Sequence, residues 1–171
     1  MDKKIERSNK DKILRRLAKQ LKDNDFKRTK PTFYVREIGN LIEFIHIHKY
    51  SFSPSFRVHI CVRVLNDPRD FIALLGIDSA AYGKPDSPSG KKYNFSYHVA
   101  DETIDRCVNN IYEFINEVAE PWYAKWHDNS ALIHSVESPL PTEDKGALKS
   151  AIEGIINEEN VANSRFLLKI A

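Results

Sequence analysis

The stretch from residue 26 to residue 64 constrains the fold more than any other part of this chain, because extended segments and a tight turn follow one another along it almost without interruption. Residues 32–38 and 41–50 are rich in β-branched and aromatic side chains, which are typical of strands. The dipeptide Gly39-Asn40 separates them and tolerates the positive φ angles of a two-residue turn. The pattern therefore predicts an antiparallel hairpin.

A two-residue turn also fixes the register of the hairpin. The expected cross-strand pairs are Ile38 with Leu41, Arg36 with Glu43, and Val35 with Phe44. Arg36 and Glu43 then form an opposite-charge pair, which stabilises a sheet by about a few tenths of a kcal/mol when it is exposed.

Residues 56–65 predict a further strand, because apolar side chains occupy every second position at its start. One face of this strand must therefore belong to the core. The residues of that face are Phe56, Val58, Ile60, Val62 and Val64, and the other face carries Arg57, His59, Cys61 and Arg63.

Apolar stripes at helical spacing predict helices at both ends of the chain. The first runs over residues 9–22. The second begins with Asp101 as its N-cap, and Pro121 is expected to stop it and to open a short helical segment over residues 121–129. A last helix starts near Thr142. Its expected buried residues are Leu148, Ala151, Ile152, Ile155 and Ile156.

Three segments lie between the hairpin region and the second helix. Residues 71–77 are apolar and too short to assign by period, and we favour a strand over a short helix. Residues 78–92 gather Gly, Pro and Ser and predict a mobile surface loop, and residues 93–99 alternate as a strand does.

Strands followed by helices predict an α+β fold, a largely antiparallel sheet of about four to five strands with an N-terminal helix and C-terminal helices packed on it.

The composition of 42% hydrophobic and 29% charged residues is typical of a globular protein, and we expect one domain over residues 1–171. The longest apolar runs fall far short of the ~20 residues that cross a bilayer, and residues 1–12 hold no apolar signal core. We therefore expect no membrane association and a cytoplasmic location. Cys61 and Cys107 lie among Ile and Val and predict reduced, buried thiols.

The net charge of +2 conceals a gradient along the chain. Residues 1–30 carry twelve Lys or Arg against five acids, a charge of +7, and residues 101–171 carry six against thirteen, a charge of −7. The basic start is compatible with nucleic-acid binding or with a solvated helix face. The acidic half repels phosphate and attracts basic protein partners, so we consider nucleic acid the less favoured partner.

No motif for catalysis is found in the sequence. The chain lacks a G-x-S-x-G elbow and the glycine patterns that cradle phosphates, and Ser96 and Cys107 lack the surroundings that activate a nucleophile. We therefore expect no catalytic residue and no cofactor, and predict that the protein is not an enzyme.

Four histidines lie on predicted strands, at His46, His48, His59 and His98. His46 and His48 point the same way, a spacing that zinc sites use. The hairpin register places both on the face of Phe44, and if that face is the core, the sheet separates them from His59. We therefore expect structural histidines and no metal, with a metal site as the open alternative.

Acidic side chains on the second helix provide a candidate binding surface. Glu113, Glu117 and Glu120 are three to four residues apart and share one stripe, with Asp128 just beyond them. The stripe fits either a contact surface for a basic partner or a solvated helix face. On the first interpretation, reversing these glutamates to Lys leaves the fold intact and weakens binding.

An aromatic cluster follows this stripe and consists of Trp122, Tyr123 and Trp126. Trp and Tyr give large contact areas at low entropic cost, so the cluster fits a recognition patch. It fits equally a cap on the core where two helices meet. We include the three aromatic residues among the candidate partner-binding residues.

Several short segments carry a resemblance to a known family. An N-terminal helix, a meander of strands and a long helix before a terminal helix accompany the segments Phe26-Lys27, Phe33 to Arg36 and Ala119-Glu120-Pro121-Trp122-Tyr123. Over most of its length the chain thus resembles the bacterial domain of unknown function family 4304, which brings no established catalytic or ligand residues.

Small cytoplasmic α+β proteins of this kind look like immunity proteins, which bind and neutralise a toxin domain. By this analogy of class, we expect an immunity protein whose acidic half blocks a basic toxin, with a nuclease as the most concrete candidate. The alternative is a nucleic-acid-binding or metal-dependent enzyme domain that uses the basic first helix or the histidine-bearing strands.

Overall fold

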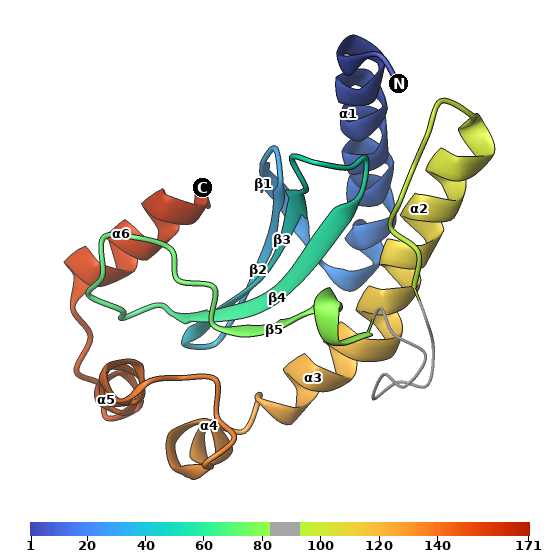
Figure 1. Ribbon diagram of the computed structural model, residues 1–171. Coiled ribbons are helices and arrows are strands. Elements are labelled where there is room, and N and C mark those ends of the chain that lie inside the picture. The colour runs from blue at the N-terminus through green and yellow to red at the C-terminus, as the bar shows by residue number, and fades with distance from the viewer. Residues whose placement is uncertain (83–92) are drawn as a thin grey trace.

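A meander of five antiparallel strands forms the centre of the computed structural model, which describes residues 1–82 and 93–171 (Figure 1). The strands follow chain order across the sheet, and each pairs with the next. They are β1 (Lys27–Lys30), β2 (Phe33–Ile38), β3 (Leu41–Lys49), β4 (Phe56–Val64) and β5 (Gly76–Asp78). The α+β fold and the antiparallel sheet expected from the sequence are therefore confirmed.

The β2–β3 hairpin has the predicted turn and register. Gly39 adopts a φ of 57°, which an L side chain rarely does, and Ile38 faces Leu41 across the turn. The remaining predicted pairs, Arg36 with Glu43 and Val35 with Phe44, are also present. The local chemistry of the turn was thus sufficient to align these two strands.

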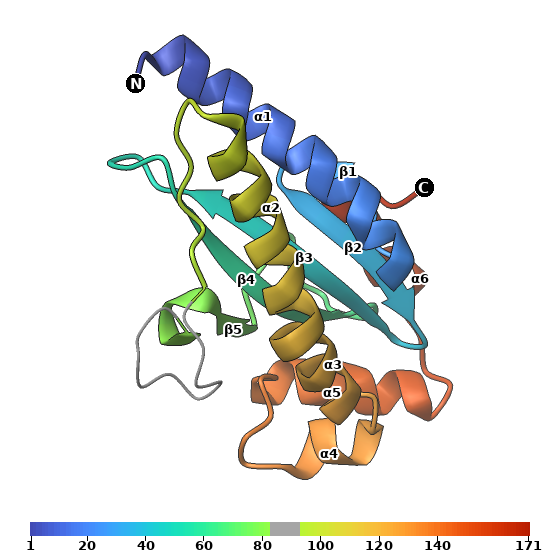
Figure 2. The ribbon, with the colours of Figure 1, turned by 90° about the vertical axis from the view of Figure 1, so that its right-hand side faces the viewer.

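Two long helices cover one face of the sheet and lie side by side across it (Figure 2). They are α1 (Lys3–Gln20), followed by the 3-10 turn η1 (Leu21–Asn24), and α2 (Asp101–Phe114). The core between helices and sheet includes the predicted face of β4 and the predicted stripe of α2. Those residues are Phe56, Val58, Ile60, Val62 and Val64 of β4, and Ile104, Cys107, Val108, Ile111, Ile115 and Val118.

Both helices begin elsewhere than predicted. The α1 helix starts six residues before the expected Asn9, because the carboxylate of Asp2 accepts hydrogen bonds from the backbone of Lys4 and Ile5 and caps the end. Asp101 is the first residue of α2, and its N-cap is Ala100. Its carboxylate instead forms an ion pair with Lys12 of α1.

Pro121 does not stop the second helix. A π turn, η3 (Ile115–Ala119), leads directly into α3 (Glu120–Lys125), and the Glu120 amide bonds to the carbonyl of Ile115. This wider turn shifts the hydrogen-bond register by one residue, so proline enters in a first turn, where its missing N–H is tolerated.

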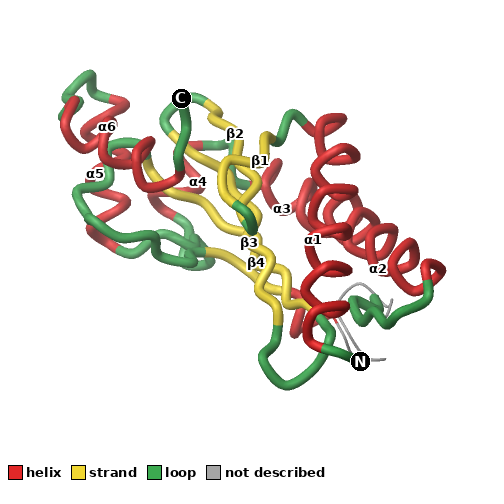
Figure 3. Tube along the Cα trace, turned by 90° about the horizontal axis from the view of Figure 1, so that it is seen from above, coloured by secondary structure: helices red, strands yellow, loops and turns green. Residues whose placement is uncertain are grey.

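Three shorter helices complete the chain, α4 (Asn129–His134), α5 (Thr142–Ile152) and α6 (Glu158–Leu168). Seen from above, α5 and α6 lie on the side of the sheet opposite α1 and α2 (Figure 3). The α6 helix was not predicted from the sequence. Its Leu168 packs in a second apolar cluster with Val35, Ile42, Phe44, Cys61 and Leu65. The predicted burial of Ile152, Ile155 and Ile156 is wrong, since all three are exposed.

Two predicted strands are corrected. Within residues 71–77, only Gly76 and Ile77 join β5, where a Cβ on Gly76 would lie 1.9 Å from the carbonyl oxygen of Ile60. Residues 93–99 form no strand of the sheet and make a single bridge, between Ser96 and Ser55. Of the predicted 78–92 loop, residues 79–82 form the 3-10 turn η2 (Ser79–Tyr82), and residues 83–92 lie outside the described part.

In the described ranges, no helix is long and apolar enough to span a membrane. Cys61 and Cys107 are both free and buried, as expected from their apolar neighbours. Burial raises the pKa of the Cys107 thiol to about 12 and raises that of Cys61 further.

Candidate functional site

A partly buried cluster of charged side chains lies where the β2–β3 hairpin meets α3. The predicted Arg36–Glu43 pair is part of it, and the pair is not exposed, since the side chain of Glu43 is 1% and that of Arg36 11% exposed. The Nε atom of Arg36 donates to Glu43 at 2.6 Å, and its two terminal nitrogens donate to Glu120 at 3.0 and 2.8 Å. The guanidinium also lies over the ring of Phe26, 4.2 Å from its centroid. Arg36 thereby links the sheet to α3.

The surroundings of Arg36 favour its charged form. Burial opposes the charge, but Glu120 and Glu43 outweigh that effect and raise the pKa of the guanidinium. A backbone carbonyl, that of Asn24, accepts a further hydrogen bond at 2.7 Å. Because all three guanidinium nitrogens donate hydrogen bonds, the arrangement fits a structural ion-pair network more closely than an acid–base site.

His127 contacts the same cluster from the end of α3. Its Nε2 atom lies 2.6 Å from a carboxylate oxygen of Glu43, which is 1% exposed, while the imidazole is 42% exposed. A buried carboxylate that orients an exposed imidazole is the arrangement of a general base. However, no Ser, Thr or Cys side chain is hydrogen-bonded to His127 among the described residues. Within the described part of the chain, the Glu43–His127 pair therefore has no hydrogen-bonded nucleophile.

The predicted acidic stripe is divided between the surface and the interior. Glu113 and Glu117 are exposed, and Glu117 accepts a hydrogen bond from the hydroxyl of Tyr93 at 2.7 Å. Glu120 belongs to the partly buried cluster and also accepts a bond from the side chain of Asn24. We therefore now expect Glu120→Lys to destabilise the fold, because the change would place two cations against each other.

The aromatic cluster belongs mostly to the core. Tyr123 is fully buried and donates from its hydroxyl to the carbonyl of Phe44 at 2.9 Å, and Trp126 is 2% exposed. Trp122 is half-buried and packs against Tyr123. These positions correct the assignment of Tyr123 and Trp126 to a recognition patch. Asp128 is exposed and caps α4 by accepting from the backbone of Ser130.

The histidines are not arranged as predicted. His46 lies directly opposite His59 across β3 and β4, and directly opposite residues share one face of a sheet. Their rings are stacked with centroids 5.6 Å apart, and His48 lies 6.3 Å from His46 on the same face. The sheet therefore does not separate them. His98 is elsewhere, where its carbonyl accepts a hydrogen bond from Asn9 of α1.

Burial and the neighbouring cations favour the neutral form of His46. Burial is the main cause, and together with the neighbouring His59, His48 and Lys30 it lowers the pKa of His46 to about 4. Burial also lowers the pKa of His59. Within residues 1–82 and 93–171, no group of three or more His, Cys, Asp or Glu side chains is placed to hold a metal ion.

The shifted histidine predicts a pH dependence of stability. An unfolded chain binds a proton at His46 near pH 6.5, whereas the native state binds it only near pH 4, so the free energy of unfolding falls as the pH drops through this interval. Urea denaturation of the wild type and of His46→Gln at about pH 7 and about pH 4.5 measures this contribution. We expect a smaller loss in the variant. An identical loss in both proteins contradicts the assignment.

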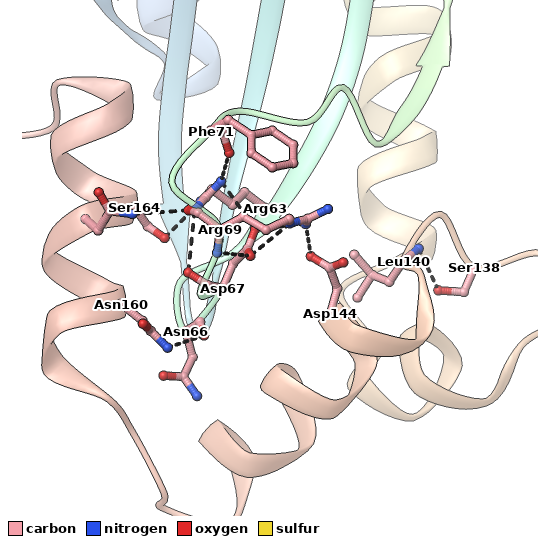
Figure 4. Close-up of polar contacts among 11 residues, drawn as sticks. Arg63, Asn66, Asp67, Arg69, Phe71, Ser138, Leu140, Asp144, Asn160 and Ser164 are labelled. Carbon is pink, nitrogen blue, oxygen red and sulfur yellow. Dashed lines mark hydrogen bonds and ion pairs between the residues drawn. The ribbon is translucent and has the colours of Figure 1, made fainter.

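A second buried network fixes the C-terminal helices to the loop after β4 (Figure 4). Arg63, which is 3% exposed, donates to Ser164 of α6 at 2.9 Å and to the carbonyl of Phe71 at 2.7 Å. Arg69 forms ion pairs with Asp67 and with Asp144 of α5. Burial raises the pKa of the Asp144 carboxyl although Arg69 opposes this. Polar contacts thereby connect β4 and the loop after it to both α5 and α6.

Four exposed acids lie on α5, on α6 and between them. Glu143 lies in the first turn of α5, Glu153 is its C-cap, and Glu158 and Glu159 begin α6. All four are exposed, and none forms an ion pair with a described residue. Only Glu153 lacks a role at a helix N-terminus, since it lies at the negative end of α5.

No protein-family model, no curated protein and no solved structure matches this chain. The resemblance to the domain of unknown function family 4304 therefore depends on the short segments quoted above and stays an expectation. Any function has to be inferred from the geometry of the chain itself.

Proposed function

We propose that this chain is a non-enzymatic, cytoplasmic protein-binding protein, and most specifically an immunity protein that binds and neutralises a basic toxin domain, such as a nuclease. The acidic helices after residue 101 provide the contact surface. The resemblance to family 4304 is compatible with this proposal but supplies no residues for it.

One observation carries the proposal, namely the exposed carboxylates on the C-terminal helices that form no ion pair with a described residue. Two basic residues of α1 are already neutralised, since Lys12 and Arg16 pair with Asp101 and Asp105 of α2. The carboxylates of Glu153, Glu158 and Glu159 have no such partner among the described residues. A surface of free carboxylates speeds association with a basic protein and repels nucleic acid.

The functional test begins with isolation of the protein from its native host. We expect the tagged chain, purified at low salt, to retain a basic protein that is lost at high salt, since surface electrostatics are screened. Expressed alone in a heterologous bacterial host, that protein should stop growth, and co-expression of this chain should restore it. A tagged acidic protein of similar net charge serves as the control for non-specific retention.

Two outcomes contradict the proposal. If the retained proteins are the same as those on the control bait, the chain has no specific basic partner. If a specific partner is found but its toxicity is unaffected by co-expression, the immunity function is wrong. A Glu113→Lys/Glu117→Lys variant, which leaves Glu120 and its ion pair with Arg36 in place, tests the remaining part of the predicted stripe in the same growth assay.

A further inference from the structure

The connection between α5 and α6 exposes three isoleucines to solvent. We refer to residues 152–159 as the elbow. Ile152, Ile155 and Ile156 are 46%, 65% and 51% exposed, whereas other isoleucines, such as Ile45 and Ile111, are fully buried. Single exposed apolar side chains are ordinary, but three within five residues form a patch of the kind that protein interfaces use.

The backbone of the elbow explains why these side chains point outward. Gly154 has a φ of 80° and ends α5, with the Gly154 amide bonded to Ala151 and the Ile155 amide bonded to Ser150. In this helix ending, the residue in the place of Ile155 commonly packs on an apolar side chain in the last turn. Here that turn offers Ser150 and Lys149, so Ile155 has no apolar partner there.

The elbow is also held in place from inside. The side chain of Asn66, which is 7% exposed, donates to the carbonyl of Ile155 at 3.4 Å and accepts from the amide of Asn157 at 2.9 Å. Asn160 in turn donates to the backbone of Asn66 at 3.2 Å. A surface whose backbone is already fixed loses little conformational entropy when it binds a partner.

The charged residues from 150 to 164 are all acidic, with Lys149 just before them in the last turn of α5. Residues 150–164 contain Glu153, Glu158 and Glu159 and no Lys or Arg. Glu158 and Glu159 stabilise the N-terminus of α6, but Glu153 lies at the C-terminus of α5, where a negative charge is unfavourable. A charge that is unfavourable for the helix, as that of Glu153 is, is the kind of local mismatch that proteins retain at functional positions.

We infer that the elbow is the docking site for the partner, a basic protein that presents an apolar patch bordered by Lys or Arg. This inference rests on the proposed function and specifies its contact surface. The isoleucines form the dry centre of the interface, and the three glutamates form its charged rim. Complementary charge at the rim selects a basic partner over an acidic one.

The test is to measure, by isothermal titration calorimetry, the Kd of variants of this chain for the basic protein recovered from the native host. We expect Ile155→Ser/Ile156→Ser to raise Kd at least about 100-fold, because the apolar centre is lost. Phe52→Ser is the matched control, since Phe52 is 82% exposed in the β3–β4 loop, and we expect no change in Kd. Unfolding midpoints measured in parallel should equal that of the wild type for both variants.

Glu153→Lys separates binding from folding. A cation at the C-terminus of α5 is favourable, so the variant should be at least as stable as the wild type, yet bind about 10-fold or more weakly and with a smaller dependence on salt. Wild-type Kd in both elbow variants overturns the docking site while the proposed function stands, provided that the partner is neutralised. Failure to recover any specific basic partner overturns the proposed function and the docking site together.

Discussion

Replacing Arg36 by Met is expected to lower the free energy of unfolding by about 3 to 5 kcal/mol, which is the usual cost of removing one partner from a buried ion pair. Among the described residues, the substitution leaves Glu43, which is 1% exposed, with His127 as its remaining polar contact, and it breaks the two hydrogen bonds to Glu120. It also removes the guanidinium from the ring of Phe26. Urea denaturation at neutral pH measures the loss.

Arg165→Met is the matched control, because Arg165 also forms a hydrogen-bonded pair with a glutamate, Glu37, on the surface. There the side chains are 46% and 29% exposed, and solvent-exposed pairs contribute about 1 kcal/mol or less. We expect the surface variant to unfold close to the wild-type midpoint. Equal losses in the two variants would mean that the partly buried cluster contributes no more than a surface pair, and that Arg36 does not link the hairpin to α3.

The hairpin could be predicted because residues next to one another in the sequence determine its turn and register. Gly39 and Asn40 define the turn, and the turn length alone sets the register of β2 on β3. The register of β3 on β4 is different, since residues 50–55 form a longer loop whose length does not determine how the two strands align. That missing register is why His59 was expected on the far side of the sheet from His46, which it in fact faces.

The sequence of the elbow contains residues typical of a helix end and of a helix start. Gly154 is a typical residue for the end of a helix, and Asn157 followed by two glutamates is a typical beginning. Read together, they end α5 before Ile155 and predict α6. The apolar spacing of Ile152, Ile155 and Ile156 instead suggested one continuous buried face, which the chain does not form.

The candidate partner-binding residues were harder to place, because their environments depend on distant parts of the chain. The contact of Glu120 with Arg36 spans 84 positions, and nothing near Glu120 in the sequence indicates it. Tyr123 is a different case. It follows Ile111, Ile115 and Ala119 at intervals of four residues, so continuing the apolar stripe through Pro121 would have predicted its burial.

Replacing Ile111 by Ala is expected to destabilise the protein by about 2 to 5 kcal/mol, as large-to-small changes in a packed core do. Ile111 is 0% exposed on α2 and belongs to the cluster that contains Ile60 of β4 and Leu14 of α1. The cost comes from the lost apolar contacts and from the cavity left where three elements meet. The midpoint of urea denaturation, analysed with an unchanged slope, gives the value.

Ile155→Ala provides the comparison for the same chemical change at an exposed position. Ile155 is 65% exposed at the elbow, so the removed atoms were already largely in water and surface substitutions of this kind change stability by about 0.5 kcal/mol or less. A large difference between the two variants places α2 against the sheet and leaves the elbow free for a partner. An unchanged midpoint for Ile111→Ala contradicts the packing of α2, whereas a large loss for Ile155→Ala means that Ile155 is covered by the protein's own residues in solution.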